Sequence, residues 1–199
     1  MMNMVVDIKD FNKNEITFLD MKKNNIIDGN FSDIIYDNSN VTFNGIFIGF
    51  YIIPHHIITY NDSSNYGLFY LDINQEYNIN IISDLIAIEY SIIEYYKDLY
   101  KINKTSIYQL KTQLQSGIIK IYKKEHYQPI SKSNELNRLP NTIHHFYTNA
   151  YIYGKDEIKE GEIINRKKNR NYLLKISGIW ENKISIGITY KITELYEEI

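Results

Sequence analysis

The sequence predicts a mainly β protein with a helical insert, an α+β fold built as a single domain of 199 residues. Isoleucine and tyrosine, which favour strands, occur 38 and 19 times, whereas alanine, the best helix former, occurs only twice. Short strand-like segments fill both ends of the chain, and one segment between them has helical spacing. The expected order of elements is therefore strands, then helices, then strands.

Six segments of the first half have the composition and the flanking turn residues of strands: 15–19, 31–36, 41–45, 46–53, 55–60 and 66–73. The run 46–53 is apolar on both faces and is expected to be buried, with Gly45 and Gly49 at bulges or bends and Pro54 ending the strand. The polar stretch 61–65 predicts a hairpin loop.

The period changes in the middle of the chain. Apolar residues there are spaced by 3, 4, 4 and 3 positions, at Leu85, Ile88, Ile92, Tyr96 and Leu99. This spacing predicts an amphipathic helix over 84–100. A second helix is expected over 105–115, capped by Thr105 or Ser106 and ended by Gly117. The helical insert is therefore expected to span 84–115.

Strands return after the insert, at 117–124, 143–153, 172–180 and 184–192. The last two flank a short turn and predict a hairpin, and residues 193–199 form a short acidic tail. Several strands, a helical element and a closing strand pair describe an oligonucleotide-binding-fold-like β-barrel with an N-terminal extension, completed by the strands of 117–192. A β-sandwich with a helical excursion is the alternative.

Charge divides the chain into an acidic and a basic part. Residues 28–100 carry ten acids and one base, whereas residues 101–175 carry fifteen bases and six acids, so the two sums are −9 and +9. This asymmetry indicates one face for an anionic partner, unless the charges interleave in the folded chain.

Signals of catalysis and of metal binding are weak in this sequence. It has no cysteine, no glycine-rich phosphate loop and no helical zinc motif. The histidine pairs at 55–56 and 144–145 fall in predicted strands, where neighbours point to opposite faces, so each pair could supply only one ligand. We therefore expect a non-enzymatic protein without a metal or another cofactor.

Basic residues interleave with aromatic ones in the second half, a pattern typical of single-stranded nucleic acid binding. Cations follow the phosphates, and flat rings accept unstacked bases. The expected contacts are Lys120, Tyr122, Lys124, Tyr151, Arg166, Lys167, Lys168, Arg170, Tyr172, Lys175 and Trp180. The four aromatic residues would stack on bases and the others would bind phosphates. In the alternative interpretation these rings face a core, and Trp180 in particular anchors it.

The segments 172–181 and 186–192 carry the positions Gly178, Trp180, Gly187, Tyr190 and Lys191. This ending resembles the last strands of single-stranded DNA-binding proteins of large nucleocytoplasmic DNA viruses, which are similar to the oligonucleotide-binding-fold proteins of podovirus-type phages. The resemblance implies sequence-tolerant DNA binding in viral replication, recombination or repair. It also implies an acidic tail, here Glu194, Glu197 and Glu198, that contacts replication proteins. Self-association along DNA is a separate expectation, through an exposed edge of the strand at 46–53. Residues 1–100 carry no motif of that family.

A virion structural or assembly protein with no role in nucleic-acid binding is the alternative function, because a β-rich chain without catalytic motifs fits both. The first seven residues lack the features of a signal peptide. The longest apolar run, 45–54, is about half of what a spanning helix needs. We therefore expect a soluble, intracellular protein that binds DNA, or RNA, and no membrane.

Overall fold

The computed structural model describes residues 5–24, 28–38, 41–57, 66–122 and 170–195. Within these ranges twelve strands form one mixed sheet. The strands are β1 (Val6–Asp7), β2 (Ile16–Phe18), β3 (Lys22–Asn24), β4 (Gly29–Asn38), β5 (Val41–Asn44), β6 (Ile46–Ile52), β7 (Pro54–Ile57), β8 (Tyr66–Leu71), β9 (Thr105–Ser106), β10 (Ile118–Tyr122), β11 (Arg170–Glu181) and β12 (Ser185–Leu195). The mainly β, α+β class expected from composition is confirmed.

The main path of the sheet runs β1-β6-β11-β12-β10-β8-β7. β4 pairs with the far end of β11 and carries β2, β3 and β5, while β9 pairs with β12. The two end strands of the path, β1 and β7, do not pair with each other in the described part of the chain, so the sheet is not closed there. The structure therefore does not confirm the expected barrel.

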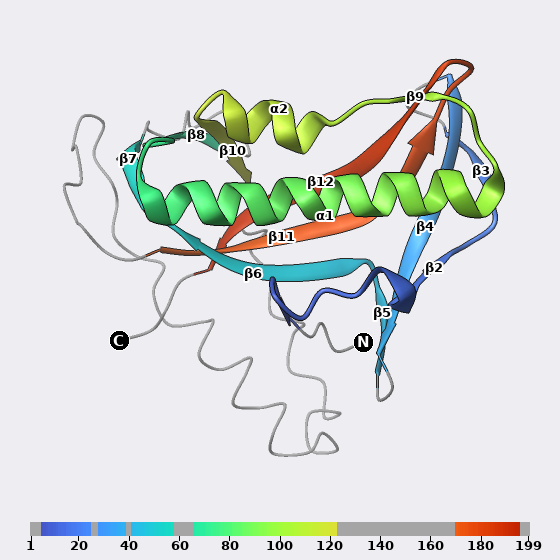
Figure 1. Ribbon diagram of the computed structural model, residues 1–199, viewed down its shortest axis with the longest axis horizontal. Helices are drawn as coiled ribbons and strands as arrows, with labels where there is room; N and C mark the ends of the chain where they lie inside the picture. The colour runs from blue at the N-terminus through green and yellow to red at the C-terminus, as the bar shows by residue number, and fades with distance from the viewer. Residues whose placement is uncertain (1–4, 25–27, 39–40, 58–65, 123–169, 196–199) are drawn as a thin grey trace, which may run out of the picture.

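Two helices cover one face of this sheet, α1 (Glu76–Tyr100) and α2 (Gln109–Gln115). Figure 1 shows α1 lying across β6, β11 and β12, with α2 above the end of the sheet formed by β8 and β10. A short 3-10 helix, η1 (Lys13–Glu15), precedes β2. Both helices come between β8 and β10, which are themselves antiparallel neighbours. None of the helices in the described ranges is both long and apolar enough to cross a membrane.

The core lies between the helices and the sheet. Strand alternation turns Ile46, Ile48, Phe50 and Ile52 of β6 toward α1, level with Tyr172, Leu174 and Ile176 of β11. Leu85, Ile92 and Ile93 of α1 and Leu110 and Leu114 of α2 complete the same cluster, each fully buried. Burial of this apolar surface is the main source of stability and holds the sheet against the helices.

The helix boundaries differ from the expected ones. α1 begins at Glu76 rather than at residue 84, so Asp84 lies in its third turn and Glu89 near its middle. The segment 105–108 is not helical, because Thr105 and Ser106 pair with β12 as strand β9. The proposed capping residues therefore belong to a strand, and α2 starts at Gln109.

Two buried polar side chains of α1 explain these boundaries. Asn78 accepts a hydrogen bond from the Ile53 N–H at 3.0 Å and donates to the carbonyls of Ile53 and Asp72 at 3.0 and 2.9 Å. It thus ties the first turns of α1 to the segments after β6 and β8. The Glu89 carboxylate accepts from the backbone N–H groups of Leu110 and Lys111 at 2.9 and 2.8 Å, so it caps α2 from another helix.

Candidate nucleic-acid interface

The face of the sheet opposite the helices carries a mixture of lysine and aromatic side chains. Leu174 and Ile192 are cross-strand partners in the core, so their neighbours Lys175 and Lys191, also partners, point to the opposite face. On β10 the core residues Ile119 and Ile121 alternate with Lys120 and Tyr122. The pairing register therefore assembles this surface from strands far apart in the sequence.

Three lysines lie level with one another on three adjacent strands. Lys175 of β11 is the direct partner of Lys191 of β12. β10 runs parallel to β12 with Tyr122 beside Thr193, which places Lys120 level with Lys191 two residues earlier. We call Lys120, Lys191 and Lys175 the lysine row. Since neighbouring strands are about 5 Å apart, the row concentrates three positive charges within a short distance.

Aromatic rings flank the lysine row. The ammonium nitrogen of Lys120 lies 3.8 Å from the ring centroid of Tyr66 and 5.0 Å from that of Tyr122. The Lys191 nitrogen is also 5.0 Å from the Tyr122 ring. Tyr66 and Tyr122, whose ring centroids are 6.0 Å apart, form what we call the tyrosine pair. Both rings are half-buried, so part of each remains accessible to a ligand.

At the other end of the row, Lys175 lies over the ring of Phe47, with 5.2 Å between its nitrogen and the ring centroid. Phe47 is only 5% exposed and does not belong to the core cluster. This ring is therefore covered, and the accessible rings beside the row are those of the tyrosine pair.

The charge of α1 is opposite in sign to that of the lysine row. Neither Lys120 nor Lys175 forms an ion pair with any residue in the described ranges. On the opposite side of the sheet, α1 carries five carboxylates and a single lysine. The carboxylates are Glu76, Asp84, Glu89, Glu94 and Asp98. Among the described residues, the acidic helix α1 thus lies behind the sheet from the lysine row, while the face of the row also carries the carboxylate of Asp33, the partner of Gly178.

Local contacts shift the pKa values of two carboxylates of α1, Glu89 and Glu94, in opposite directions. Burial raises the pKa of the Glu89 carboxyl, although the N–H groups of Lys111 and Leu110 oppose this effect. Burial also acts to raise the pKa of Glu94, but hydrogen bonds from Ser106 and Tyr108 and the charge of Lys97 outweigh it, so the pKa is lowered. Glu94 accepts from Ser106 and Tyr108 at 2.9 Å each. These two groups hold the segment between α1 and α2 and do not face the lysine row.

Only part of the predicted contact set lies on this face. Lys120, Tyr122 and Lys175 are brought together as expected. Tyr172 points into the core, 3% exposed, with its ring 5.7 Å from that of Phe50. Strand alternation predicts which residues share a face but not which face is buried, so Tyr172 as a stacking residue is corrected to a core residue. Arg170 is the first residue of β11. The remaining predicted contacts lie outside the described residues, and they are Lys124, Tyr151, Arg166, Lys167 and Lys168.

Trp180 is on the same face as the lysine row but farther along β11, beside Gly187 of β12. A Cβ added at Gly187 would lie 2.7 Å from the indole ring, so the ring occupies the space that glycine leaves free. The indole N–H donates to the Ile188 carbonyl at 3.1 Å. Trp180 is half-buried and outside the core cluster. Its ring therefore covers a glycine of the neighbouring strand, a structural role that neither prediction for Trp180 described.

The sequence interpretation missed Tyr66, and it named Lys191 only through the family resemblance. The signal for Tyr66 was its place in an alternating segment, where Tyr66, Leu68 and Tyr70 share one face. The parallel pairing of β10 with β12 and its antiparallel pairing with β8 bring Tyr66 and Lys191 beside Tyr122. Pairing between strands this distant in sequence leaves no local signal.

The acidic tail is also partly corrected. Glu194 belongs to β12, is 7% exposed and is the cross-strand partner of Tyr172, on the helix side of the sheet. It therefore faces away from the lysine row and is not part of a tail. Glu197 and Glu198 lie outside the described residues.

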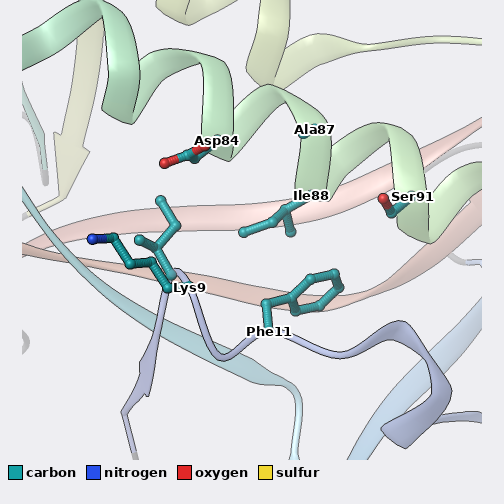
Figure 2. Close-up of a pocket in the computed structure, with 7 residues that line it drawn as sticks. Lys9, Phe11, Asp84, Ala87, Ile88 and Ser91 are labelled. Carbon is teal, nitrogen blue, oxygen red and sulfur yellow. The ribbon is translucent and has the colours of Figure 1, made fainter.

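One shallow pocket, of about 360 Å³, lies between α1 and the segment before η1. Figure 2 shows Lys9 and Asp84 at one end, Phe11 and Ile88 in the middle, and Ser91 at the other end. This lining is mostly apolar, and its two charged side chains, Lys9 and Asp84, do not form an ion pair with each other. No group of three or more metal-ligating side chains occurs among the described residues. The second histidine pair, at 144–145, falls outside them.

Comparison with known proteins gives no relative: no family model matches the chain, and neither a curated protein nor a solved structure is significantly similar to it.

Proposed function

We propose that this protein binds single-stranded DNA without base specificity and without catalysis, through the lysine row and the tyrosine pair. The observation that carries the proposal is the register of Lys120, Lys191 and Lys175 on three adjacent strands, beside two accessible rings. Phosphates of a single strand pair with such cations, and its unstacked bases stack on such rings for about 1–3 kcal/mol each.

The energetics of the free protein support an anionic ligand. Like charges directly opposite each other on an antiparallel strand pair repel and destabilise the sheet. Lys175 and Lys191 are such a pair, and Lys120 adds a third positive charge beside them. A phosphate bound between them would relieve this repulsion. Departures of this kind from the local rules occur most often at functional sites.

The sequence that leads into β11 is also basic. Arg166, Lys167, Lys168 and Arg170 immediately precede or begin β11, the strand that carries Lys175. The sequence holds only three arginines, and arginine is the usual reader of guanine. Lysine contacts to phosphates and ring contacts to bases require no particular base, which supports sequence-tolerant binding.

Single strands suit this surface better than a duplex. Bases of a duplex are already stacked and paired, so the tyrosine pair could gain nothing from them without melting. Groove reading also needs a protruding helix or ribbon. The lysine row instead lies on the surface of the sheet, where a flexible strand can reach both cations and rings.

The proposed biological setting comes from the resemblance of the C-terminal hairpin to viral single-stranded DNA-binding proteins. β11 and β12 supply two of the three lysines, so the segment that carries the resemblance also carries the proposed site. We extend the proposal to viral DNA replication, recombination or repair inside the host cell. The oligonucleotide-binding barrel of that family remains part of the proposal, although the surface proposed here needs only the open sheet.

Fluorescence anisotropy tests this function with a labelled oligo-dT of about 30 nucleotides and a duplex of equal length, each over a salt series. The proposal predicts binding of the single strand that weakens steeply with salt, and weaker binding of the duplex. Absence of binding to the single strand at low salt, or preference for the duplex, contradicts it. An oligo-U of the same length separates DNA from RNA preference.

A further inference from the structure

We propose that Lys120 covers the face of Tyr66 in the free protein and exchanges this contact for a phosphate when a nucleotide stacks there. This inference rests on the proposed function and specifies what the site recognises. The ammonium nitrogen of Lys120 is 3.8 Å from the centroid of the Tyr66 ring, the shortest cation–ring distance in the described part of the chain. A base cannot stack on that ring face while the ammonium occupies it.

The second ring of the tyrosine pair, Tyr122, is also contacted by ammonium groups. Lys120 and Lys191 both lie 5.0 Å from the centroid of Tyr122. The two rings therefore hold two members of the lysine row, and the cations that would bind phosphates lie against the rings that would bind bases. Ligand binding must separate them.

Magnitudes favour this separation. A cation–ring contact at an exposed site is worth about a 2- to 5-fold factor in an equilibrium constant. Stacking of a base on an aromatic side chain is worth about 5- to 160-fold. The base therefore replaces the ammonium, and Lys120 is released within reach of the phosphate of the same or the next nucleotide.

The exchange determines the class of ligand. A neutral aromatic compound provides the ring contact but leaves the released lysine without a partner. A polyanion without bases attracts Lys120 but leaves the ring unused. Only a base together with an adjacent phosphate of the same strand replaces both halves of the Lys120–Tyr66 contact, so the recognised ligand is a stretch of single-stranded nucleic acid.

The test compares oligo-dT with a thymine peptide nucleic acid of equal length, which carries the same bases on an uncharged backbone, for the unaltered protein and for the variants Lys120→Ala and Lys175→Ala. The neutral ligand must displace Lys120 from the Tyr66 ring without offering it a phosphate, so loss of Lys120 removes a cost of binding. We expect affinity for the peptide nucleic acid to rise about 2- to 5-fold in Lys120→Ala and to stay unchanged in Lys175→Ala, which uncovers no ring of the tyrosine pair. Both variants should bind oligo-dT more weakly, because each loses a phosphate contact. An unchanged or lower affinity of Lys120→Ala for the peptide nucleic acid overturns the exchange.

A nuclear magnetic resonance measurement tests the same contact directly. The ε-methylene protons of Lys120 should be shifted upfield by the Tyr66 ring in the free protein and should lose this shift when oligo-dT is added. Persistence of the shift in the bound state contradicts the exchange while leaving DNA binding intact. Failure of the unaltered protein to bind oligo-dT contradicts the proposed function as well, so the two failures are distinguishable.

Discussion

Lys175 and Lys191 are direct cross-strand partners on the two central strands of the sheet, β11 and β12, on the side away from both helices. Two positive charges at this spacing destabilise the free protein, by roughly 0.2–1 kcal/mol for directly opposed residues. Natural sheets usually place opposite charges or uncharged residues at such a pair. The proposed function accounts for this arrangement, because an anion bound between the two lysines would relieve their repulsion.

Salt should therefore stabilise the free protein through this pair. Salt screens the repulsion among the three lysines and so stabilises the unaltered protein. In Lys191→Glu, salt instead screens the attraction of the new carboxylate to Lys175 and Lys120, and so destabilises the variant. We expect the stability of the unaltered protein relative to Lys191→Glu to increase by about 0.2–1 kcal/mol between low and high salt. Urea unfolding at both salt concentrations measures this difference. A difference that does not change with salt contradicts repulsion in the lysine row.

The Glu89 carboxylate should be essential for the stability of the first turn of α2. The variant Glu89→Ala leaves the N–H groups of Leu110 and Lys111 without their acceptor in a buried position, which we expect to cost about 2–4 kcal/mol. Glu76→Ala, an exposed carboxylate of the same helix, is the matched control and should change stability little. Urea unfolding of both variants checks the prediction, and equal effects would show that the cap is unimportant.

Because the pKa of Glu89 is raised, its contribution to the free energy of unfolding should depend on pH. Because the folded state holds the proton more tightly than the unfolded state, with its pKa of 4.5, the stabilising contribution is complete below 4.5. It is lost as the pH rises through the folded-state pKa. The difference in free energy of unfolding between the unaltered protein and Glu89→Gln, measured by urea unfolding, should therefore decrease as the pH rises. A gap that widens over the same range contradicts the assigned direction.

Asn78 should contribute as much as a large core residue, although it is polar. Its three hydrogen bonds join α1 to Ile53 and Asp72, and the side chain is fully buried. Asn78→Ala should lower the free energy of unfolding by about 2–4 kcal/mol, because backbone groups at Ile53 lose their partners. Asn80→Ala, at an exposed position of the same helix, should have little effect. Thermal unfolding of the pair measures the contrast.

Trp180 should act mainly on stability rather than on DNA binding. Trp180→Phe keeps a ring over Gly187 but loses the bond to Ile188, so we expect a loss of about 0.5–1.5 kcal/mol and unchanged DNA affinity. Gly187→Ala should destabilise more, since its Cβ would meet the indole ring at 2.7 Å. Unfolding and anisotropy measurements on the same samples separate the two properties. Loss of DNA affinity in a stable Trp180→Phe would instead favour the stacking role.

The sequence predicted elements whose signals are local. The hairpin of β11 and β12 alternates apolar and polar residues around a turn at Asn182, and both strands were expected. The first turns of α1 contain Asn78, Ile79 and Asn80, which are poor helix formers, and they are helical because Asn78 bonds to Ile53. The start of α2 depends on Glu89, twenty residues before Gln109. Such tertiary partners are invisible to a local pattern.

The same limit applies to the candidate site. The alternation of Lys120 with Tyr122 was visible in the sequence, but the lysine row depends on which strands become neighbours. Lys191 lies beside Lys120 because β10 pairs in parallel with a strand about 70 positions later, and no local rule predicts that pairing. Tyr172 failed as a contact for the related reason that alternation alone does not say which face the helices cover.

The most direct test of the lysine row as the DNA-binding surface is the salt dependence of oligo-dT affinity in Lys175→Gln, compared with Lys101→Gln. Lys101 is exposed at the end of α1, on the helix side of the sheet. Loss of one phosphate contact should flatten the slope of log affinity against log salt by about 0.7 in Lys175→Gln and leave it unchanged in Lys101→Gln. Equal slopes in the two variants would contradict binding at the lysine row.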